Sequence, residues 1–188
     1  MGNAAVNTTR KMTAEEFLAW EAEQPERHEF IDGEIFAMTG ATKRHVMVAG
    51  NAYMALRQHL AGTPCRTYMA DVKVAAATAN KFFYPDVVVT CSEADHQDRL
   101  IVREPTLIIE VLSPSTAGHD LFKKFRHYQD TPSLREIAFI DPDERSTTVF
   151  RRGADGLWVL HRFDDDAAVR FESVDLTIPA TVLFAEVD

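Results

Sequence analysis

Two acidic residues, Asp86 and Glu110, stand in stretches of sequence that are otherwise strongly apolar. Three valines follow Asp86, and Glu110 lies between Ile109 and Val111. A buried ionised carboxylate without a partner is so costly that it calls for a cation, a basic side chain or solvent at a strand end. Two carboxylates that converge at one end of a sheet would suit Mg²⁺ or Mn²⁺, with water and phosphate oxygens completing the shell. We therefore predict a metal site at Asp86 and Glu110. The structural alternative also stays open: each acid could mark the end of a strand or pair with a nearby arginine.

A basic residue, Lys124, is the candidate third member of this site. The sequence predicts a helix over residues 118–130 with an apolar stripe that runs from Leu121 to Tyr128. At about 100° per residue, Lys124 lies about 60° from Leu121 and about 40° from Tyr128, beside the buried stripe. Lys123 points to the opposite side. Next to two embedded acids, Lys124 could orient or activate a water molecule. The alternative is a surface lysine whose stem covers apolar surface.

The first third of the chain shows three elements that precede these residues. Thr13 and Glu16 form a capping-box pattern that predicts a helix to about Glu21. Asp-Gly at positions 32 and 33 separates two short apolar stretches and predicts a β-hairpin over residues 29–36. Apolar residues at spacings of three and four then predict an amphipathic helix over residues 42–59, and the expected buried stripe is Val46, Ala49, Tyr53, Leu56 and Leu60.

The acids belong to a series of apolar stretches of strand length. Strands are expected over residues 66–75, 82–90, 106–112 and 136–141, and the most apolar of them should be covered on both faces. Antiparallel strands at 147–150 and 158–160 should flank a turn at Asp155-Gly156, and a further strand is expected at 174–178. The elements predict one α/β domain over residues 12–188, with a mixed central sheet flanked by helices and antiparallel hairpins at both ends. Residues 1–11 are expected to form a flexible tail.

Composition limits the classes of function that remain. The chain has 188 residues and a formal net charge of -9, which weighs against a protein that coats nucleic acid through a broad basic face. No apolar run reaches the roughly 20 residues that a membrane-spanning helix needs, so no membrane association is expected. The two cysteines, Cys65 and Cys91, form no C-x-x-C pair. This argues against a disulfide framework or a thiolate zinc site, and it fits a reducing, cytoplasmic location.

Several motifs around these residues resemble the Uma-two family of restriction-endonuclease-like proteins, within the PD-(D/E)xK nuclease superfamily. The resemblance covers roughly residues 12–151. Its motifs are the hairpin at residues 29–35, His45 before the first long helix, Tyr84-Pro85-Asp86, the segment from Pro105 through Glu110 to Thr116, Asp120 with Lys124 and Tyr128, and the strand from Glu136 to Pro142. The family likeness implies a restriction-endonuclease-like fold and Mg²⁺- or Mn²⁺-dependent cleavage of nucleic acid, most simply DNA.

One residue departs from the basic superfamily pattern. The superfamily lysine lies two positions after the acid on the same strand, and here that position is Leu112. The resemblance implies that the lysine has moved to the following helix, as Lys124. The angular positions on that helix also place Lys124 beside the buried apolar stripe. The implied catalytic residues are thus Asp86, Glu110 and Lys124, with the two acids as metal ligands.

Two further residues, Glu34 and His45, could support this site. Glu34 could be a further ligand, although an exposed hairpin acid is favoured. His45 could contact phosphate or hold an active-site acid, or it could cap the helix start. Two rivals to a nuclease are a non-catalytic interaction module with the same fold and a hydrolase of small phosphoesters. Homodimers are expected from the resemblance, with the apolar stretch from Val174 to Val187 as a candidate interface.

Overall fold

A computed structural model of the chain describes residues 11–38, 40–76, 80–113 and 120–187, so the expected tail lies outside it except for Lys11. The helices are α1 (Ala14–Glu21), α2 (Lys43–His59), α3 (Glu93–Gln97), α4 (Asp120–Tyr128) and α5 (Ala180–Leu183), with a short 3-10 helix η1 (Glu172–Val174). The strands are β1 (His28–Ile31), β2 (Glu34–Ala37), β3 (Arg66–Met69), β4 (Lys73–Ala75), β5 (Lys81–Phe83), β6 (Val87–Thr90), β7 (Ile101–Val102), β8 (Pro105–Val111), β9 (Glu136–Asp141), β10 (Ser146–Arg152), β11 (Trp158–Phe163), β12 (Val169–Phe171) and β13 (Leu176–Ile178).

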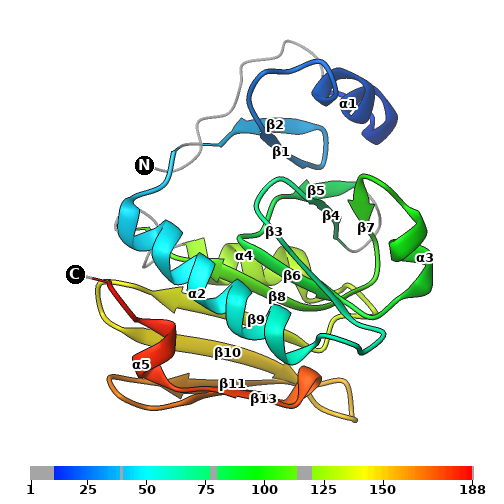
Figure 1. Cartoon of the computed structure of the whole chain (residues 1–188). Helices are drawn as coiled ribbons and strands as arrows, with labels where there is room; N and C mark the ends of the chain where they lie inside the picture. The colour runs from blue at the N-terminus through cyan, green and yellow to red at the C-terminus, as the bar shows by residue number, and fades with distance from the viewer. Residues whose placement is uncertain (1–10, 39, 77–79, 114–119, 188) are drawn as a thin grey trace.

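The central sheet has six strands in the order β11-β10-β9-β8-β6-β3 (Figure 1). β8 and β9 pair in parallel, joined through α4, and all the other pairs of this sheet are antiparallel. A parallel pair needs a crossover connection, and α4 is that connection. The predicted mixed sheet with flanking helices is confirmed, and so are the antiparallel strands near the C-terminus.

A second sheet of five strands, in the order β2-β1-β5-β4-β7, carries the N-terminal hairpin, and β12 and β13 form a separate two-stranded ribbon. Two predicted strands are wrong as continuous elements, because both are divided between the two large sheets. The stretch 66–75 becomes β3 and β4, and the stretch 82–90 becomes β5 and β6. The chain therefore crosses from one sheet to the other just before Asp86.

The two divisions have local causes. Pro85 has no N–H to donate to a ladder, so it ends the first half of the stretch 82–90. Ala70 takes a positive φ of 54°, which interrupts the extended backbone after β3. Its N–H donates to the carbonyl oxygen of Asp86 at 3.1 Å, so the two breaks lie side by side.

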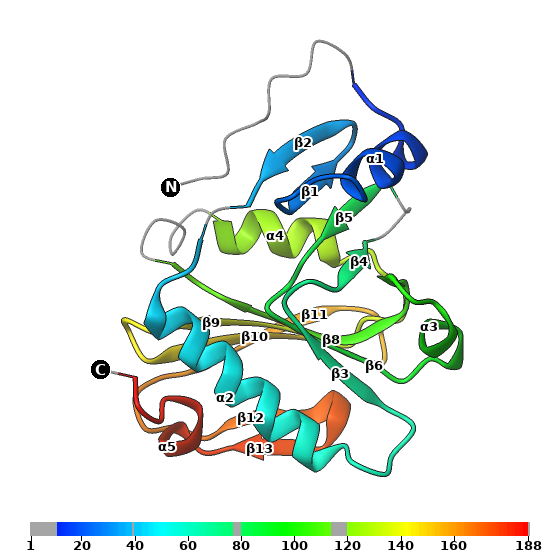
Figure 2. The ribbon, with the colours of Figure 1, turned by 45° about the horizontal axis from the view of Figure 1, so that its top comes forward.

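α2 and α4 cover opposite faces of the six-stranded sheet (Figure 2). Successive side chains of strand β8 point to opposite faces of this sheet, so alternate residues pack into different cores. Ile109 belongs to the core beneath α2, whereas Ile108 belongs to the core beneath α4. The prediction for the stripe of α2 is wrong at Val46, which is 55% exposed; the buried positions include Val48 and Ala52 instead.

The predicted local signals near the N-terminus are confirmed. Thr13 and Glu16 form both hydrogen bonds of the capping box at the start of α1. Asp32 and Gly33 have φ values of 51° and 95°, as a two-residue hairpin turn requires, and they connect β1 to β2.

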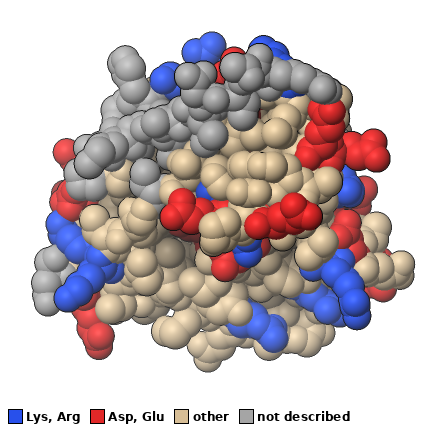
Figure 3. Space-filling view, turned by 90° about the horizontal axis from the view of Figure 1, so that it is seen from above, with Lys and Arg blue, Asp and Glu red and all other residues tan. Residues whose placement is uncertain are grey.

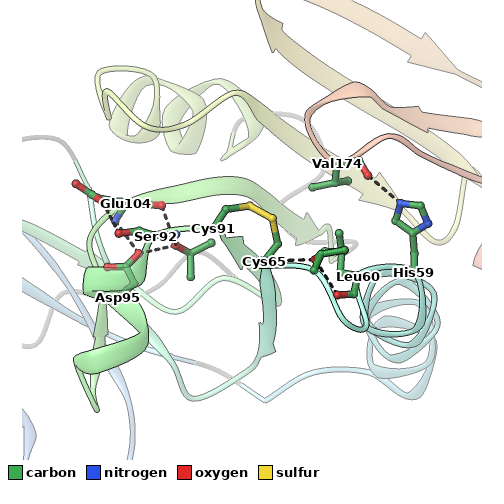
Figure 4. The surroundings of a disulfide bond; sticks show 10 residues. His59, Leu60, Cys65, Cys91, Ser92, Asp95, Glu104 and Val174 are labelled. Carbon is green, nitrogen blue, oxygen red and sulfur yellow. Dashed lines mark hydrogen bonds between the residues drawn. A yellow bond between two sulfur atoms is a disulfide. The ribbon is translucent and has the colours of Figure 1, made fainter.

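The cysteine prediction is wrong, because Cys65 and Cys91 form a disulfide (Figure 4). The β3–β6 ladder pairs Arg66 with Thr90, so the next positions outward are the two cysteines. Spacing along the sequence could not reveal this pairing, since it depends on the register of two strands in space.

The C-terminal stretch packs mainly inside the molecule. Val174, Ile178, Leu183 and Phe184 all belong to the core beneath α2. Among the large apolar side chains of this stretch, only Val182 is exposed, at 45%. The predicted homodimer stays a prediction, and this stretch offers it little apolar surface. Among the described residues, no helix has the length and apolar character needed to cross a membrane.

Candidate active site

The β6–β8 ladder brings Asp86 and Glu110 together. Val87 pairs with Ile109 in this antiparallel ladder, so Asp86, one residue earlier, comes opposite Glu110. Glu110 points to α4, whereas Asp86 directly precedes β6 and accepts a hydrogen bond from the N–H of Val111, the residue after Glu110. The two acids therefore lie close together at this end of the ladder.

Glu110 is almost completely buried and has two partners on α4. Its Oε2 lies 2.9 Å from the Nζ of Lys124, and its Oε1 accepts a hydrogen bond of 2.8 Å from the hydroxyl of Tyr128. The Glu110 side chain is only 6% exposed. Lys124 and Tyr128 are four residues apart, and one helix face therefore presents both groups to Glu110.

Asp86 is held from two other directions. Its Oδ2 accepts a hydrogen bond of 2.7 Å from the backbone N–H of Val111. Its Oδ1 lies 2.7 Å from Nε2 of His45, in the first turn of α2. Of the roles considered for His45, holding an active-site acid is the one that this contact supports. The side chain of Thr42, not His45, caps the helix.

Lys124 also contacts a second carboxylate, that of Glu29. The Oε1 of Glu29, on β1, lies 3.3 Å from Nζ, and the side chain of Glu29 is 6% exposed. Sequence reasoning missed Glu29, although it carries the signal used for Asp86 and Glu110, an acid beside the apolar pair Phe30 and Ile31. The predicted side of α4 for Lys124 is confirmed, because its amine points to Glu110.

Electrostatics couple these groups. Burial raises the pKa of Glu110 to about 7, with Asp86 and Glu29 adding to the rise and Lys124 opposing it. Burial alone would lower the pKa of Lys124, but Glu110 and Glu29 outweigh it and raise that pKa, so the ammonium stays charged. Burial also acts to lower the pKa of His45, and its hydrogen bond and attraction to Asp86 outweigh burial and raise the pKa.

Other predicted residues lie elsewhere or outside the description. Glu34 is 55% exposed and forms an ion pair with Lys11 at 3.8 Å. This agrees with the favoured interpretation of Glu34 as an exposed acid of the hairpin. The side chain of Asp120 and the turn at residues 114–116 lie outside the described residues.

The donor set suits a hard divalent cation with an open shell. Among the described residues, each oxygen of Asp86 and Glu110 has one partner, and an ionised carboxylate has about four acceptor positions in all. Within the described ranges, no group of three or more His, Cys, Asp or Glu side chains could hold a metal by itself. Mg²⁺ is usually held by one or two carboxylates, with water and phosphate oxygens as the remaining ligands. The two acids fit that pattern.

Surface charge is mixed on the face seen from the top of Figure 1. Acidic and basic side chains lie interspersed on the face shown in Figure 3, over a largely uncharged surface. On the described part of that face the basic residues do not gather into one broad patch. Any contact with a polyanion there would be local.

The chain is similar over most of its length to a described family and to two proteins of one Synechocystis strain. Residues 14–181 match the model of the Uma2 family, described as "Putative restriction endonuclease". Two relatives come from Synechocystis sp. (strain ATCC 27184 / PCC 6803 / Kazusa). "Uncharacterized protein slr1290" is 30% identical over 174 residues, which are 93% of this chain and 92% of that protein. "Uncharacterized protein sll1609" is 34% identical over 157 residues, 82% of this chain and 89% of that protein.

A solved structure has the same fold. It is described as "a putative nuclease belonging to DUF820" from Anabaena variabilis ATCC 29413, and it superposes with a TM-score of 0.77 over 94% of this chain and 99% of that one, at 21% identity. The family match spans nearly the whole domain and includes the ladder and the helix that carry Asp86, Glu110 and Lys124. This chain therefore belongs to the Uma2 family, described as that of putative restriction endonucleases.

Proposed function

We propose that the protein is a metal-dependent nuclease that hydrolyses phosphodiester bonds, with DNA as its substrate. The observation that carries the proposal is the site in which Lys124 lies 2.9 Å from Glu110 and Asp86 accepts a hydrogen bond from the N–H of Val111, the residue after Glu110. Membership of a family described as putative restriction endonucleases supports the reaction class. The name of the solved neighbour, a putative nuclease, points the same way.

The chain's own residues have distinct parts in this mechanism. Asp86 and Glu110 would hold Mg²⁺ or Mn²⁺, which when bound polarises a phosphate and lowers the pKa of a coordinated water. His45 and the N–H of Val111 fix the orientation of the Asp86 carboxylate. Lys124 keeps a positive charge at the edge of the site, where it can orient the attacking water or stabilise the charge that develops on the phosphate oxygens.

Cleavage of plasmid and linear DNA in Mg²⁺ or Mn²⁺ tests the proposal. Wild type should cut, and Glu110→Gln should lower the rate by about 100-fold or more, because a weak neutral ligand replaces a carboxylate beside the metal. Glu23→Gln, an exposed acid on the turn after α1, is the matched control and should cut like wild type. Thermal melting shows that each variant is folded.

Two other outcomes would overturn the proposal. A wild type that cuts no nucleic acid, together with a Glu110→Gln variant unchanged in metal binding, would indicate a non-catalytic module. Hydrolysis of nucleotide-sized phosphoesters without cleavage of any polymer would indicate a small-molecule hydrolase.

A further inference from the structure

The ammonium group of Lys124 is shared between carboxylates from two different sheets. Glu110 lies on β8 of the six-stranded sheet, with Oε2 2.9 Å from Nζ, and Glu29 lies on β1 of the five-stranded sheet, with Oε1 3.3 Å from Nζ. Both acids are 6% exposed, whereas Lys124 is 27% exposed. α4 lies between the six-stranded sheet and the N-terminal hairpin (Figure 2), so Lys124 joins the two layers.

This sharing matters because a metal ion and Lys124 would use the same carboxylate. Oε1 of Glu110 is already engaged by the hydroxyl of Tyr128, and Oε2 is engaged by Lys124. A divalent cation at Glu110 would therefore share the negative charge of this carboxylate with the ammonium, and the pairing between Lys124 and Glu110 would weaken. A buried ammonium that lost its only counter-ion would be strongly disfavoured, so a second acid within reach lowers the cost of metal binding.

We propose that Glu29 is a positioning residue for Lys124: it holds the ammonium beside the metal site when Glu110 turns to the metal. The inference rests on the proposed function, since it assumes a metal at Asp86 and Glu110. It also explains how a lysine on a helix can replace one on the strand. The lysine side chain is long and flexible, and Glu29 restricts where its charged end can lie.

A different role for Glu29, as a metal ligand itself, makes an opposite prediction. If Glu29 acts through Lys124, its effect on metal affinity must disappear once Lys124 has lost its charge. If Glu29 binds the metal directly, its effect must persist without the lysine. A double-mutant cycle over Glu29 and Lys124 separates the two roles.

The experiment is Mn²⁺ titration by isothermal calorimetry of the full chain. We expect Glu29→Gln to weaken Mn²⁺ binding by about 10-fold, the usual size of an effect exerted through another residue of a metal site. Lys124→Met should bind Mn²⁺ at least as tightly as wild type, because the competing ammonium is gone. In the Lys124→Met background, Glu29→Gln should change the affinity by less than about 3-fold, within the range expected when the two residues no longer interact.

The control is Asp32→Asn, which removes one negative charge from the same hairpin. Asp32 is 58% exposed, pairs with Lys81 at 3.8 Å and occupies a turn position that asparagine also favours. Its Mn²⁺ affinity should match that of wild type, and thermal melting checks that every variant is folded.

The contradicting results are distinct. An equal loss of affinity from Glu29→Gln with and without Lys124, or no loss in either background, would overturn this inference while leaving the metal site intact. A wild type that binds no Mn²⁺ at all would overturn the proposed function, and this inference with it.

Discussion

Glu110 combines near-complete burial with a pKa of about 7, against an ordinary value of 4.5. In metal-free buffer between these two pH values, the unfolded chain has lost this proton and the folded protein keeps it. The stability that Glu110 contributes is therefore fully present below pH 4.5 and is lost as pH rises through 7. Relative to Glu110→Gln, the free energy of unfolding of wild type should fall by on the order of 3 kcal/mol over this range.

Urea unfolding at several pH values, with a chelator present, measures this difference. Glu144→Gln, an exposed acid, provides the comparison and should follow the wild-type curve with a constant offset. Parallel curves for wild type and Glu110→Gln would show that the carboxyl titrates at its ordinary pH.

His45 is the second residue whose role can be tested singly. Its Nε2 lies 2.7 Å from Asp86, and its raised pKa strengthens this contact near neutral pH. His45→Ala should weaken Mn²⁺ binding by about 10-fold, because Asp86 loses a group that orients it. Lys43→Ala, at an exposed position two residues earlier on α2, should leave the affinity unchanged. Equal affinities for wild type and His45→Ala would leave His45 without a role at the metal.

At the level of single residues, an acid in an apolar strand does not by itself identify an active-site residue. Glu136 meets the same criterion, yet its carboxylate accepts from Nε of Arg151 at 2.8 Å and from the backbone N–H groups of Glu172 and Ser173. That is the structural alternative considered for Asp86 and Glu110. Two observations distinguish Asp86 and Glu110 from Glu136: the resemblance to a known family and the lysine on α4. The sequence of the strand alone shows neither of them.

At the scale of elements, α1 is tied to the sheets by a buried polar cluster around Glu21. This carboxylate, 1% exposed, lies within 3.0 Å of the backbone N and of Nδ1 of His28 and accepts a 2.8 Å hydrogen bond from the hydroxyl of Tyr84. Tyr84→Phe should destabilise the protein by about 1.5–3 kcal/mol, because a buried charged acceptor loses a donor.

Chemical denaturation with urea measures this loss. Tyr53→Phe, a change at a half-buried position on α2, is the control and should shift the midpoint little. A Tyr84→Phe variant as stable as wild type would mean that water or another group satisfies Glu21.

The disulfide joins two elements, because Cys65 precedes β3 and Cys91 follows β6, at a separation of 26 residues. Closing a loop of that size restricts the unfolded chain by about 3–4 kcal/mol. Reduction should therefore lower the urea midpoint of wild type, whereas a variant with both cysteines changed to serine should not respond to reductant. Two free thiols in the denatured, unreduced protein would contradict the bond.

Elements with a strong local signal could be predicted from the sequence, and elements set by tertiary contacts could not. The predicted strand at 136–141 agrees with β9, and the capping box marks the start of α1. In contrast, a continuous strand over 82–90 was expected because periodicity carries no information about which sheet a residue joins. The short segments β7 and α3 have too few residues to show any period.

At the scale of the whole molecule, the net charge of -9 limits how the protein can bind its proposed substrate, DNA. A polyanion must approach a protein that repels it on average, so its binding has to rely on the metal and on a few local cations. Three carboxylates surround Lys124 and raise its pKa, which keeps one of those cations charged inside the site. The fold class could be predicted from the order of helices and strands, but Glu29 could not be placed, because only the packing of one sheet against α4 brings it to Lys124.

The central claim is that Asp86 and Glu110 hold one divalent ion. Crystals of the wild-type protein soaked in Mn²⁺ test it, with anomalous scattering used to locate manganese. The account predicts a manganese peak between the two carboxylates, within about 2.0–2.3 Å of an oxygen of each, and no peak there in Glu110→Gln crystals. A wild-type site without manganese, with Lys124 still paired to Glu110, would contradict the account.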